Sequence, residues 1–281
     1  YTTTGMPGTM NVDTLYDMNG TWSKTTLINM MESGLNFVNH LGHCNTTYAM
    51  KMTTSDVPSF DNDGTVHSYN FVYSQGCYCG AFDNRDTSYG VYVGDCFAEE
   101  FNVDDDGAVS VVMNSRYGWG DPGGTNGSSQ YFHREFVDAI TSEGIYPQGE
   151  VNDDSKVDVI WAINYGANRW CYYELNLFGD PAMHLWTGSP VALNVSHPSG
   201  MVVGQPDVTV NAGVAGATVT AYYDDYSVYA TGVTNGAGEV TLSPSPQVPG
   251  TMYIKAFAHD HLVYEGSLEV APAAGMSPYS S

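Results

Sequence analysis

Positively charged residues are scarce in this sequence of 281 residues: Lys and Arg total 8 against 31 Asp and Glu, and the formal net charge is −23. A field of that sign repels nucleic-acid phosphates and anionic lipid surfaces. Long apolar runs are also missing, since none approaches the roughly 20 residues that a membrane helix needs. The sequence therefore disfavours nucleic-acid partners and membrane insertion, and it suits a soluble protein living in salt or binding divalent cations.

Cysteines are few, and all of them lie before residue 172: Cys44, Cys77, Cys79, Cys96 and Cys171. The sequence has no initiator Met and no signal peptide, so we expect a processed protein that is secreted or at the cell surface. An odd number of cysteines in such a protein leaves at least one thiol unpaired. A buried, inert thiol and a reactive nucleophile are both open at this point.

Short apolar runs alternate with helical patterns in the first two thirds of the sequence. Strands are predicted at residues 35–41, 69–74 and 108–113, and helices at 23–34, 96–101 and 129–142. Ser23 caps the first helix and Gly34 ends it. Continuous apolar strands between helices indicate an α/β domain whose parallel sheet is covered on both faces.

Each predicted strand ends in a glycine-rich, polar turn that carries a residue suited to chemistry. These residues are His43, Cys77 and Trp119. In open α/β sheets, ligands bind at the carboxyl ends of the strands. We therefore expect the three side chains to meet on one rim of the sheet.

The pattern changes near Pro190, where short β-type segments are separated by Gly, Pro, Asn and Asp at near-regular spacing. About 80 residues of this kind are typical of an immunoglobulin-like β-sandwich. The sequence is thus divided into residues 1–188, an α/β domain, residues 189–272, an all-β immunoglobulin-like sandwich, and residues 273–281, a linker or tail.

The turns after the first two strands contain the two groups of a thiol peptidase. His43 supplies an imidazole and Cys77 a thiol, and Gly42 and Gly76 directly precede them. A thiol peptidase needs an accessible thiolate with an imidazole close enough to move its proton. Taken alone, this pattern leaves a Cys–His dyad and a structural His beside an inert Cys about equally open.

Five segments then resemble gingipain-type cysteine peptidases, in the order found in that family. They are residues 36–43 (NFVNHLGH), 73–83 (YSQGCYCGAFD), 96–101 (CFAEEF), 114–121 (NSRYGWGD) and 177–183 (LFGDPAM). The resemblance spans about residues 14–270, and an immunoglobulin-like module after the peptidase domain is also a habit of the family.

The resemblance implies a caspase-like sheet, here in partial form, and a cysteine endopeptidase acting on protein or peptide substrates without a cofactor. It implies that Cys77 is the nucleophile and His43 the acid/base. The backbone N–H groups of Cys77 and Cys44 would hold the oxyanion. The substrate pocket would be formed by Trp119, Gln75 and Gly76.

Two departures from the family pattern keep alternatives open. Cys44 stands where the family has glycine, and its sulfur could crowd the pocket or bridge to Cys77 or Cys79. Only 42 residues precede His43, so we expect a separate N-terminal chain of the same precursor as a partner. Together these departures favour, as the alternative function, a catalytically inactive extracellular structural or adhesive subunit. Cys79 is also open as a rival nucleophile or redox partner.

Acidic turns and exposed tyrosines suggest further binding. A structural Ca²⁺ could use Asp61, Asp63, Asp104 and Asp106, although Asp-Gly turns explain these residues as well. A third hypothesis is a carbohydrate- or surface-binding β-module that uses Tyr222, Tyr223, Tyr226 and Tyr229. His40 is expected to be structural.

Overall fold

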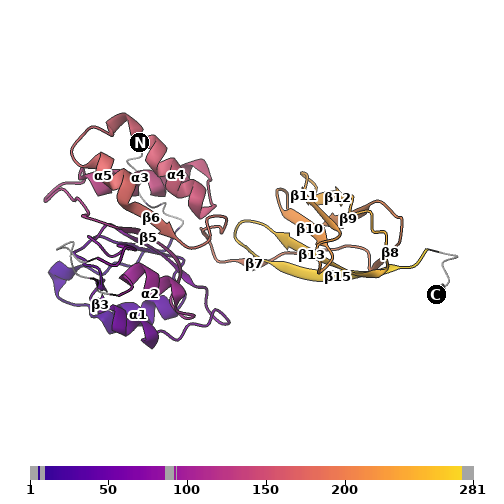
Figure 1. Cartoon of the computed structure of the whole chain (residues 1–281), viewed down its shortest axis with the longest axis horizontal. Helices are drawn as coiled ribbons and strands as arrows, with labels where there is room; N and C mark the ends of the chain where they lie inside the picture. Colours follow the sequence, from indigo (N-terminus) through magenta and orange to yellow (C-terminus); the bar gives the residue numbers. More distant parts are fainter. Residues whose placement is uncertain (1–5, 7–9, 86–91, 93, 274–281) are drawn as a thin grey trace. The chain divides into compact units, whose positions relative to one another are not determined.

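The computed structural model describes residues 6, 10–85, 92 and 94–273 (Figure 1). The chain forms two compact units, Tyr1–Thr187 and Gly188–Ser281. Of the predicted tail 273–281, residues 274–281 lie outside the described residues. No helix in the described part of the chain has both the length and the apolar character needed to cross a membrane.

A four-stranded sheet forms the centre of the first unit. Its order is β1 (Phe37–His40), β4 (Asn70–Ser74), β5 (Ala108–Asn114) and β6 (Leu175–Phe178). The first three strands are parallel, and β6 pairs with β5 in the antiparallel sense. The three parallel strands confirm the predicted ones, whereas β6 was not predicted. A small hairpin, β2 (Tyr48–Ala49) and β3 (Met52–Thr53), follows β1.

Helices cover both faces of this sheet (Figure 1). One face carries α1 (Lys24–Glu32) and α2 (Phe97–Val103), and the other carries α3 (Ser128–Asp138), α4 (Gln148–Asp158) and α5 (Asn168–Glu174). Short 3₁₀ helices are found at η1 (Asp17–Asn19), η2 (Thr54–Ser59) and η4 (Ile160–Ala162), and a π-helical turn, η3 (Ala139–Glu143), follows α3. The Ser23 hydroxyl accepts the Thr26 N–H, as the predicted cap requires.

Alternation along β4 explains why its apolar run is continuous. Phe71 and Tyr73 face a core beneath α3, whereas Val72 faces the core beneath α1 and α2. Side chains alternate between the faces of a strand, so a strand buried on both faces is apolar on both at its centre, and the polar Asn70 and Ser74 stand at the two ends of this one. All five residues of β4 are buried.

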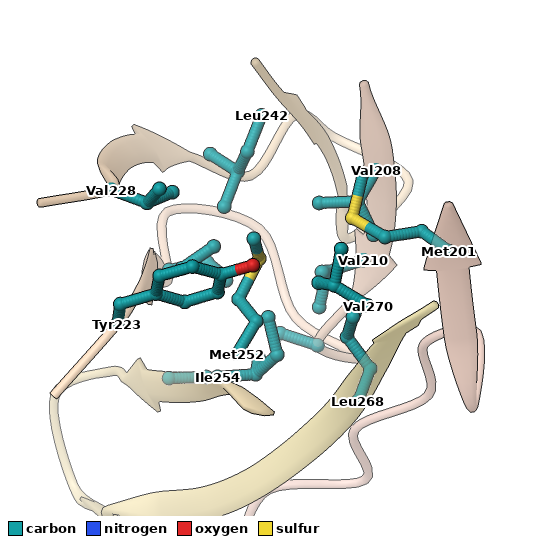
Figure 2. Close-up of a cluster of buried hydrophobic side chains, with 14 of the residues drawn as sticks. Met201, Val208, Val210, Tyr223, Val228, Leu242, Met252, Ile254, Leu268 and Val270 are labelled. Carbon is teal, nitrogen blue, oxygen red and sulfur yellow. The ribbon is translucent and has the colours of Figure 1, made fainter. Parts of the chain in front are cut away.

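The second unit is all-β. Its five-stranded sheet has the order β11 (Tyr229–Val233), β10 (Thr218–Tyr222), β13 (Gly250–Phe257), β15 (Tyr264–Ala271) and β8 (Gly200–Val202). A second layer pairs β9 (Val208–Asn211) with β12 (Glu239–Leu242), and β7 (Val191–Ala192) pairs with β14 (His261–Leu262). Figure 2 shows the apolar core of this unit, where Val210 and Leu242 face Met252 and Ile254.

One of the four tyrosines predicted to form an exposed binding surface on the β-module is buried instead. Tyr223 is only 6% exposed, and its hydroxyl donates to the Val248 carbonyl over 2.7 Å. Figure 2 shows its ring within the core. Tyr226 and Tyr229 are exposed as expected. Tyr223 lies one residue beyond β10, and its ring turns inward there.

Candidate active site

The pairing of β1 with β4 sets where the predicted dyad lies. His40 is the register partner of Ser74, and the Gln75 N–H donates to the His40 carbonyl over 3.0 Å, which extends the ladder beyond the strand ends. His43 and Cys77 each follow this registered pair by three residues. The two strands are parallel neighbours, so both turns leave the same edge of the sheet.

The turn that carries Cys77 is held by hydrogen bonds to the end of β5. The Tyr78 N–H donates to the Arg116 carbonyl over 2.7 Å, and the Asn114 side-chain amide donates to the Gly76 carbonyl over 3.0 Å. Tyr78 is fully buried and has a φ of 60°, in the left-handed region that non-glycine residues rarely adopt. Backbone strain of this kind gathers at functional sites, where the surrounding structure maintains it.

The Cys77 thiol is half-buried in this turn. Its Sγ lies 3.7 Å from the Gly118 carbonyl oxygen. Burial is the largest cause that raises the pKa of Cys77, with Cys79 and Glu174 adding to the shift. The resting group is therefore the thiol, and it needs a base to become a nucleophile. His43, on the neighbouring turn, is exposed.

Two backbone amides at this edge are available to an incoming oxygen. Among the described residues, neither the Cys44 N–H nor the Cys77 N–H has an acceptor, whereas the adjoining Gly76 and Tyr78 amides are both engaged. An oxyanion hole requires donors that are not already used. The amides predicted for this role are thus free to serve it.

Cys44 fills the space beside Gly76. A Cβ placed on Gly76 would lie 2.0 Å from Cys44 Sγ, so only glycine fits at that position. The same sulfur lies 3.8 Å from His40 Nδ1 and 3.8 Å from Ser74 Oγ. All five cysteines are free thiols in the structure, including the three whose bridging would have silenced the site.

His40 is the second imidazole at this edge. Its Nδ1 lies 2.9 Å from Ser74 Oγ, and burial lowers the pKa of His40 to about 4. The ring is therefore neutral at physiological pH, and its hydrogen bond ties β1 to β4. This agrees with the structural role expected for His40.

A cavity of about 680 Å³ lies next to the Cys77 turn. Its lining residues come from the loop after Cys79, the loop after β5, and α5: Phe82, Asp83, Ser115, Arg116, Tyr117, Trp119, Trp170, Tyr173 and Glu174. Of the three residues predicted to form the substrate pocket, Trp119 lines this cavity. Gln75 and Gly76 are buried and do not line it.

Glu174 is the chemically notable residue that the sequence interpretation missed. It is 4% exposed, and burial raises the pKa of its carboxyl to about 7. The only hint in the sequence is an acid that closes the aromatic stretch 170–174 and directly precedes an apolar strand. Local spacing could not show that this acid borders a cavity beside Cys77.

The predicted calcium residues are electrostatic neighbours. The pKa of Asp106 is raised, first by desolvation and then by the charges of Asp104, Asp61, Asp105 and Asp63. Several also act as turn formers; for example, Asp63 Oδ1 accepts the Thr65 N–H over 2.9 Å. In the described part of the chain, the acidic group with ligand atoms within 4.8 Å of one another is a different one, Glu143, Asp154 and Asp158, which could hold a metal ion.

Comparisons with known proteins identify the family and the fold. The model of peptidase family C25 matches residues 1–186. The crystal structure of the Arg-specific cysteine proteinase gingipain R superposes with a TM-score of 0.73 at 16% identity, covering 88% of this chain and 56% of that one. The complex of Porphyromonas gingivalis RgpB pro- and mature domains gives a TM-score of 0.72 at 16% identity, with 88% and 57% coverage.

A further structure, named as that of a protease, matches with a TM-score of 0.70 at 19% identity, covering 86% of this chain and 56% of that one. No curated protein matches the sequence. Because 56–57% of each of these solved chains is covered, this chain spans a little over half the length of its structural relatives. The likeness extends through their immunoglobulin-like region. With more than half of the chain matched by the family model, this protein belongs to peptidase family C25, the gingipain family of cysteine peptidases.

Proposed function

We propose that this protein is a secreted or cell-surface cysteine endopeptidase that hydrolyses peptide bonds with Cys77 as nucleophile and His43 as general acid/base. One observation carries the proposal. The parallel register of β1 and β4 pairs His40 with Ser74, and the imidazole and the thiol each follow that pair by three residues. Membership of the cysteine peptidase family supports the reaction type. The fold by itself would not, because one fold can carry many unrelated functions.

The proposed reaction proceeds through an acyl-enzyme. His43 takes the proton of Cys77, and the sulfur attacks the carbonyl carbon of the scissile bond. The oxyanion that forms is held by the Cys77 and Cys44 N–H groups. The His43 imidazolium then protonates the leaving amine, and a water molecule deprotonated by His43 hydrolyses the thioester to release the acid.

The environment of the thiol makes the base essential. Because burial raises the pKa of Cys77, few of these thiols ionise unaided at neutral pH. Proton transfer to an imidazole on the adjoining turn supplies the thiolate only when it is needed. We therefore expect His43→Ala to lose almost as much activity as Cys77→Ala, since residues that act as a unit are not additive.

An inactive structural or adhesive subunit is the second candidate. The observation that favours it is Cys44, whose side chain occupies the space beside Gly76 that a glycine in its place would leave open. Within the described residues, the Cys44 amide nevertheless has no backbone acceptor and can still donate. Chemistry at Cys77 distinguishes the two functions.

We also propose a division of roles between the two domains, a partner chain and a structural ion. The division at residue 188 assigns the chemistry to the first domain and leaves residues 189–272 as a supporting immunoglobulin-like module. This chain spans a little over half of its structural relatives, and a separate N-terminal chain of the same precursor is proposed as the partner that completes the site. A structural Ca²⁺ at Asp61, Asp63, Asp104 and Asp106 is likewise proposed.

Hydrolysis of a mixed peptide library by the complete protein, with any partner chain that accompanies it, tests the function. Under reducing conditions we expect cleavage that falls at least about 1,000-fold in Cys77→Ala and in His43→Ala. Cys96→Ser serves as a matched control, because this buried cysteine lies in the core beneath α2. Cleavage that persists in Cys77→Ala would refute the assignment, and no cleavage by the unmodified protein would favour the inactive subunit.

A further inference from the structure

Two thiols besides that of Cys77 lie at the sheet edge that carries the candidate dyad. We propose that Cys44 and Cys79 form an oxidation site, at which a small disulfide such as oxidised glutathione converts the two thiols into a Cys44–Cys79 disulfide bond. This bond joins the turn of the proposed base to the turn of the proposed nucleophile. Its formation does not depend on the proposed peptidase function, whereas its effect on cleavage rests on that function.

The hydroxyl of Ser74 marks the place where the two sulfurs meet. Cys44 Sγ lies 3.8 Å from Ser74 Oγ, and Cys79 Sγ lies 3.7 Å from the same oxygen. The two thiols are also in hydrogen-bond contact with each other, and this contact is the largest cause that raises the pKa of Cys79. Cys44 packs against the apolar cluster in which Cys79 is buried. These contacts place the two sulfurs side by side, on turns that follow different strands.

Cys77 Sγ has a different neighbour. It lies 3.7 Å from the carbonyl oxygen of Gly118, on the loop after β5. The contacts of Cys44 Sγ are instead with residues at the ends of β1 and β4. The sequence leaves Cys77 and Cys79 both open as partners of Cys44, and these contacts favour Cys79. The gingipain pattern has glycine where Cys44 stands, so that pattern does not contain this pair.

Exposure assigns a separate step to each thiol. Cys44 is half-buried, whereas Cys79 has no exposed surface, so a reagent from solvent reaches Cys44 first. The Cys44 thiolate attacks one sulfur of the small disulfide, breaks its S–S bond and releases one thiolate. Cys79 then loses its proton, attacks the Cys44 sulfur of this mixed disulfide and releases the second thiolate. The two cysteine protons pass to the two released thiolates, so two thiols are oxidised and one disulfide is reduced.

The bond alters the edge that the proposed chemistry uses. Bonded sulfurs lie closer together than sulfurs in contact, so the Cys44 sulfur moves toward Cys79. Its surroundings are tight, because a Cβ on Gly76 would lie 2.0 Å from Cys44 Sγ and 3.1 Å from the Gly42 carbonyl oxygen. The backbone that carries His43 and the Cys44 N–H therefore shifts with the sulfur. A shift on the order of 1 Å can lower a catalytic rate about 100-fold.

Peptide mapping of Cys77→Ala tests the bond itself, because this variant removes the competing thiol and the assay needs no activity. The complete folded protein is treated with oxidised glutathione, its remaining thiols are blocked, and it is digested with trypsin without reduction. The lysine and arginine positions place Cys44 in peptide 25–51 and Cys79 in peptide 52–85. We expect the two peptides to be joined, with a mass two hydrogen atoms below their sum, until a reductant separates them. Unlinked peptides, or only a glutathione adduct on Cys44, would overturn the inference.

Two further substitutions, each added to Cys77→Ala, show whether the link depends on this pair. Cys79→Ser keeps a donor in place of the buried thiol, and it should leave peptide 25–51 with a glutathione adduct. Cys96→Ser removes another buried thiol of the same core and should leave the link unchanged. Loss of the link in Cys96→Ser would assign the bond to a different pair and contradict the inference.

Cleavage of the peptide library then measures the consequence in the protein with all five cysteines. Oxidation should lower cleavage at least about 10-fold, and reduction should restore it. Cys44→Gly, compared with its own reduced form, should lose less than about 2-fold, because it cannot form the bond. An equal loss in Cys44→Gly would assign the loss to oxidation of Cys77 and overturn the effect proposed for the bond. If the reduced protein cleaves nothing, the peptidase proposal fails on its own, and the mapping still decides the oxidation site.

Discussion

The two units of this protein bury different kinds of residue. In the described part of the chain, the second unit buries one polar side chain, Thr234, beneath an otherwise apolar core. The first unit buries all the others, including Ser74, Asn114 and Glu174. All five cysteines lie in the first unit as well.

The second unit thus has an almost wholly apolar core, whereas the first unit holds the groups suited to chemistry. Buried polar groups cost free energy unless they are fully bonded, and a fold retains them where they perform a function. In the first unit, a buried carboxyl borders a cavity next to the turn that carries a half-buried thiol. The β unit has no comparable burden. We therefore expect substitutions in the two units to have separable effects, and the following predictions test this contrast.

The largest effect is expected in the β core. Ile254 is fully buried on β13, and Ile254→Ala should lower the free energy of unfolding of that unit by about 2–5 kcal/mol. Peptide cleavage measured below the new melting temperature should remain unchanged. Val233→Ala, at an exposed site on β11, is the matched control and should change stability by less than about 0.5 kcal/mol. A loss of cleavage in folded Ile254→Ala would show that the two units are not separable.

The second prediction concerns pH. The carboxyl of Glu174 has a pKa of about 7 when folded, against 4.5 for the free group, so the folded state keeps its proton where the unfolded state has lost it. This contribution is present below pH 4.5 and is lost as the pH rises to 7. The first unit should thus lose up to about 3 kcal/mol of stability across that window.

Removing the titratable carboxyl of Glu174 should flatten the pH dependence of the stability of the first unit. Urea unfolding of the first unit of Glu174→Gln, measured from pH 4 to pH 8, should give a variant more stable than the unmodified protein at pH 8 and close to it at pH 4. Glu100→Gln should retain the original slope. Identical slopes for Glu174→Gln and the unmodified protein would show that this carboxyl is not the group responsible.

The smallest expected effect lies at the turn itself. Gly76→Ala places a methyl group against Cys44 Sγ and should cost about 1–3 kcal/mol of stability together with much of the activity. Cys44→Gly removes that sulfur, so the double variant should recover stability and cleavage. A double-mutant cycle measures this coupling directly. Additive effects of the two substitutions would contradict the packing of Cys44 against Gly76.

Much of the fold could be predicted from sequence because its signals are local. The centre of β4 is a continuous apolar run because both faces of that strand are buried. In the second unit, the β-type segments at 208–210, 218–223, 229–233, 239–242 and 251–257 match β9 to β13 to within one residue at each end. In contrast, α4 buries Gln148, Asn152 and Ser155 beside Val151, so it carries no apolar period by which it could be found. Helix α5 is short, and its Trp170 and Tyr173 are exposed.

The residues of the candidate site could likewise be predicted only where a local sequence pattern marks them. The turns with His43 and Cys77 could be found because each follows a strand directly. The position of Glu174 at the cavity depends on α5 meeting the loop after β5, a contact between distant segments that no local pattern encodes. Similarly, Asp61 and Asp104 were predicted as calcium ligands from local acidic turns. The acids Glu143, Asp154 and Asp158 come together only in the folded chain.

The central claim is that parallel strands bring a functional thiol and imidazole to one edge of the sheet. Its most direct test is covalent labelling of the complete protein, under reducing conditions, with a peptidyl acyloxymethyl ketone, followed by peptide mapping. We expect modification of Cys77 alone among the five cysteines, and loss of that modification in His43→Ala. An unlabelled Cys77, or equal labelling in the absence of His43, would contradict it.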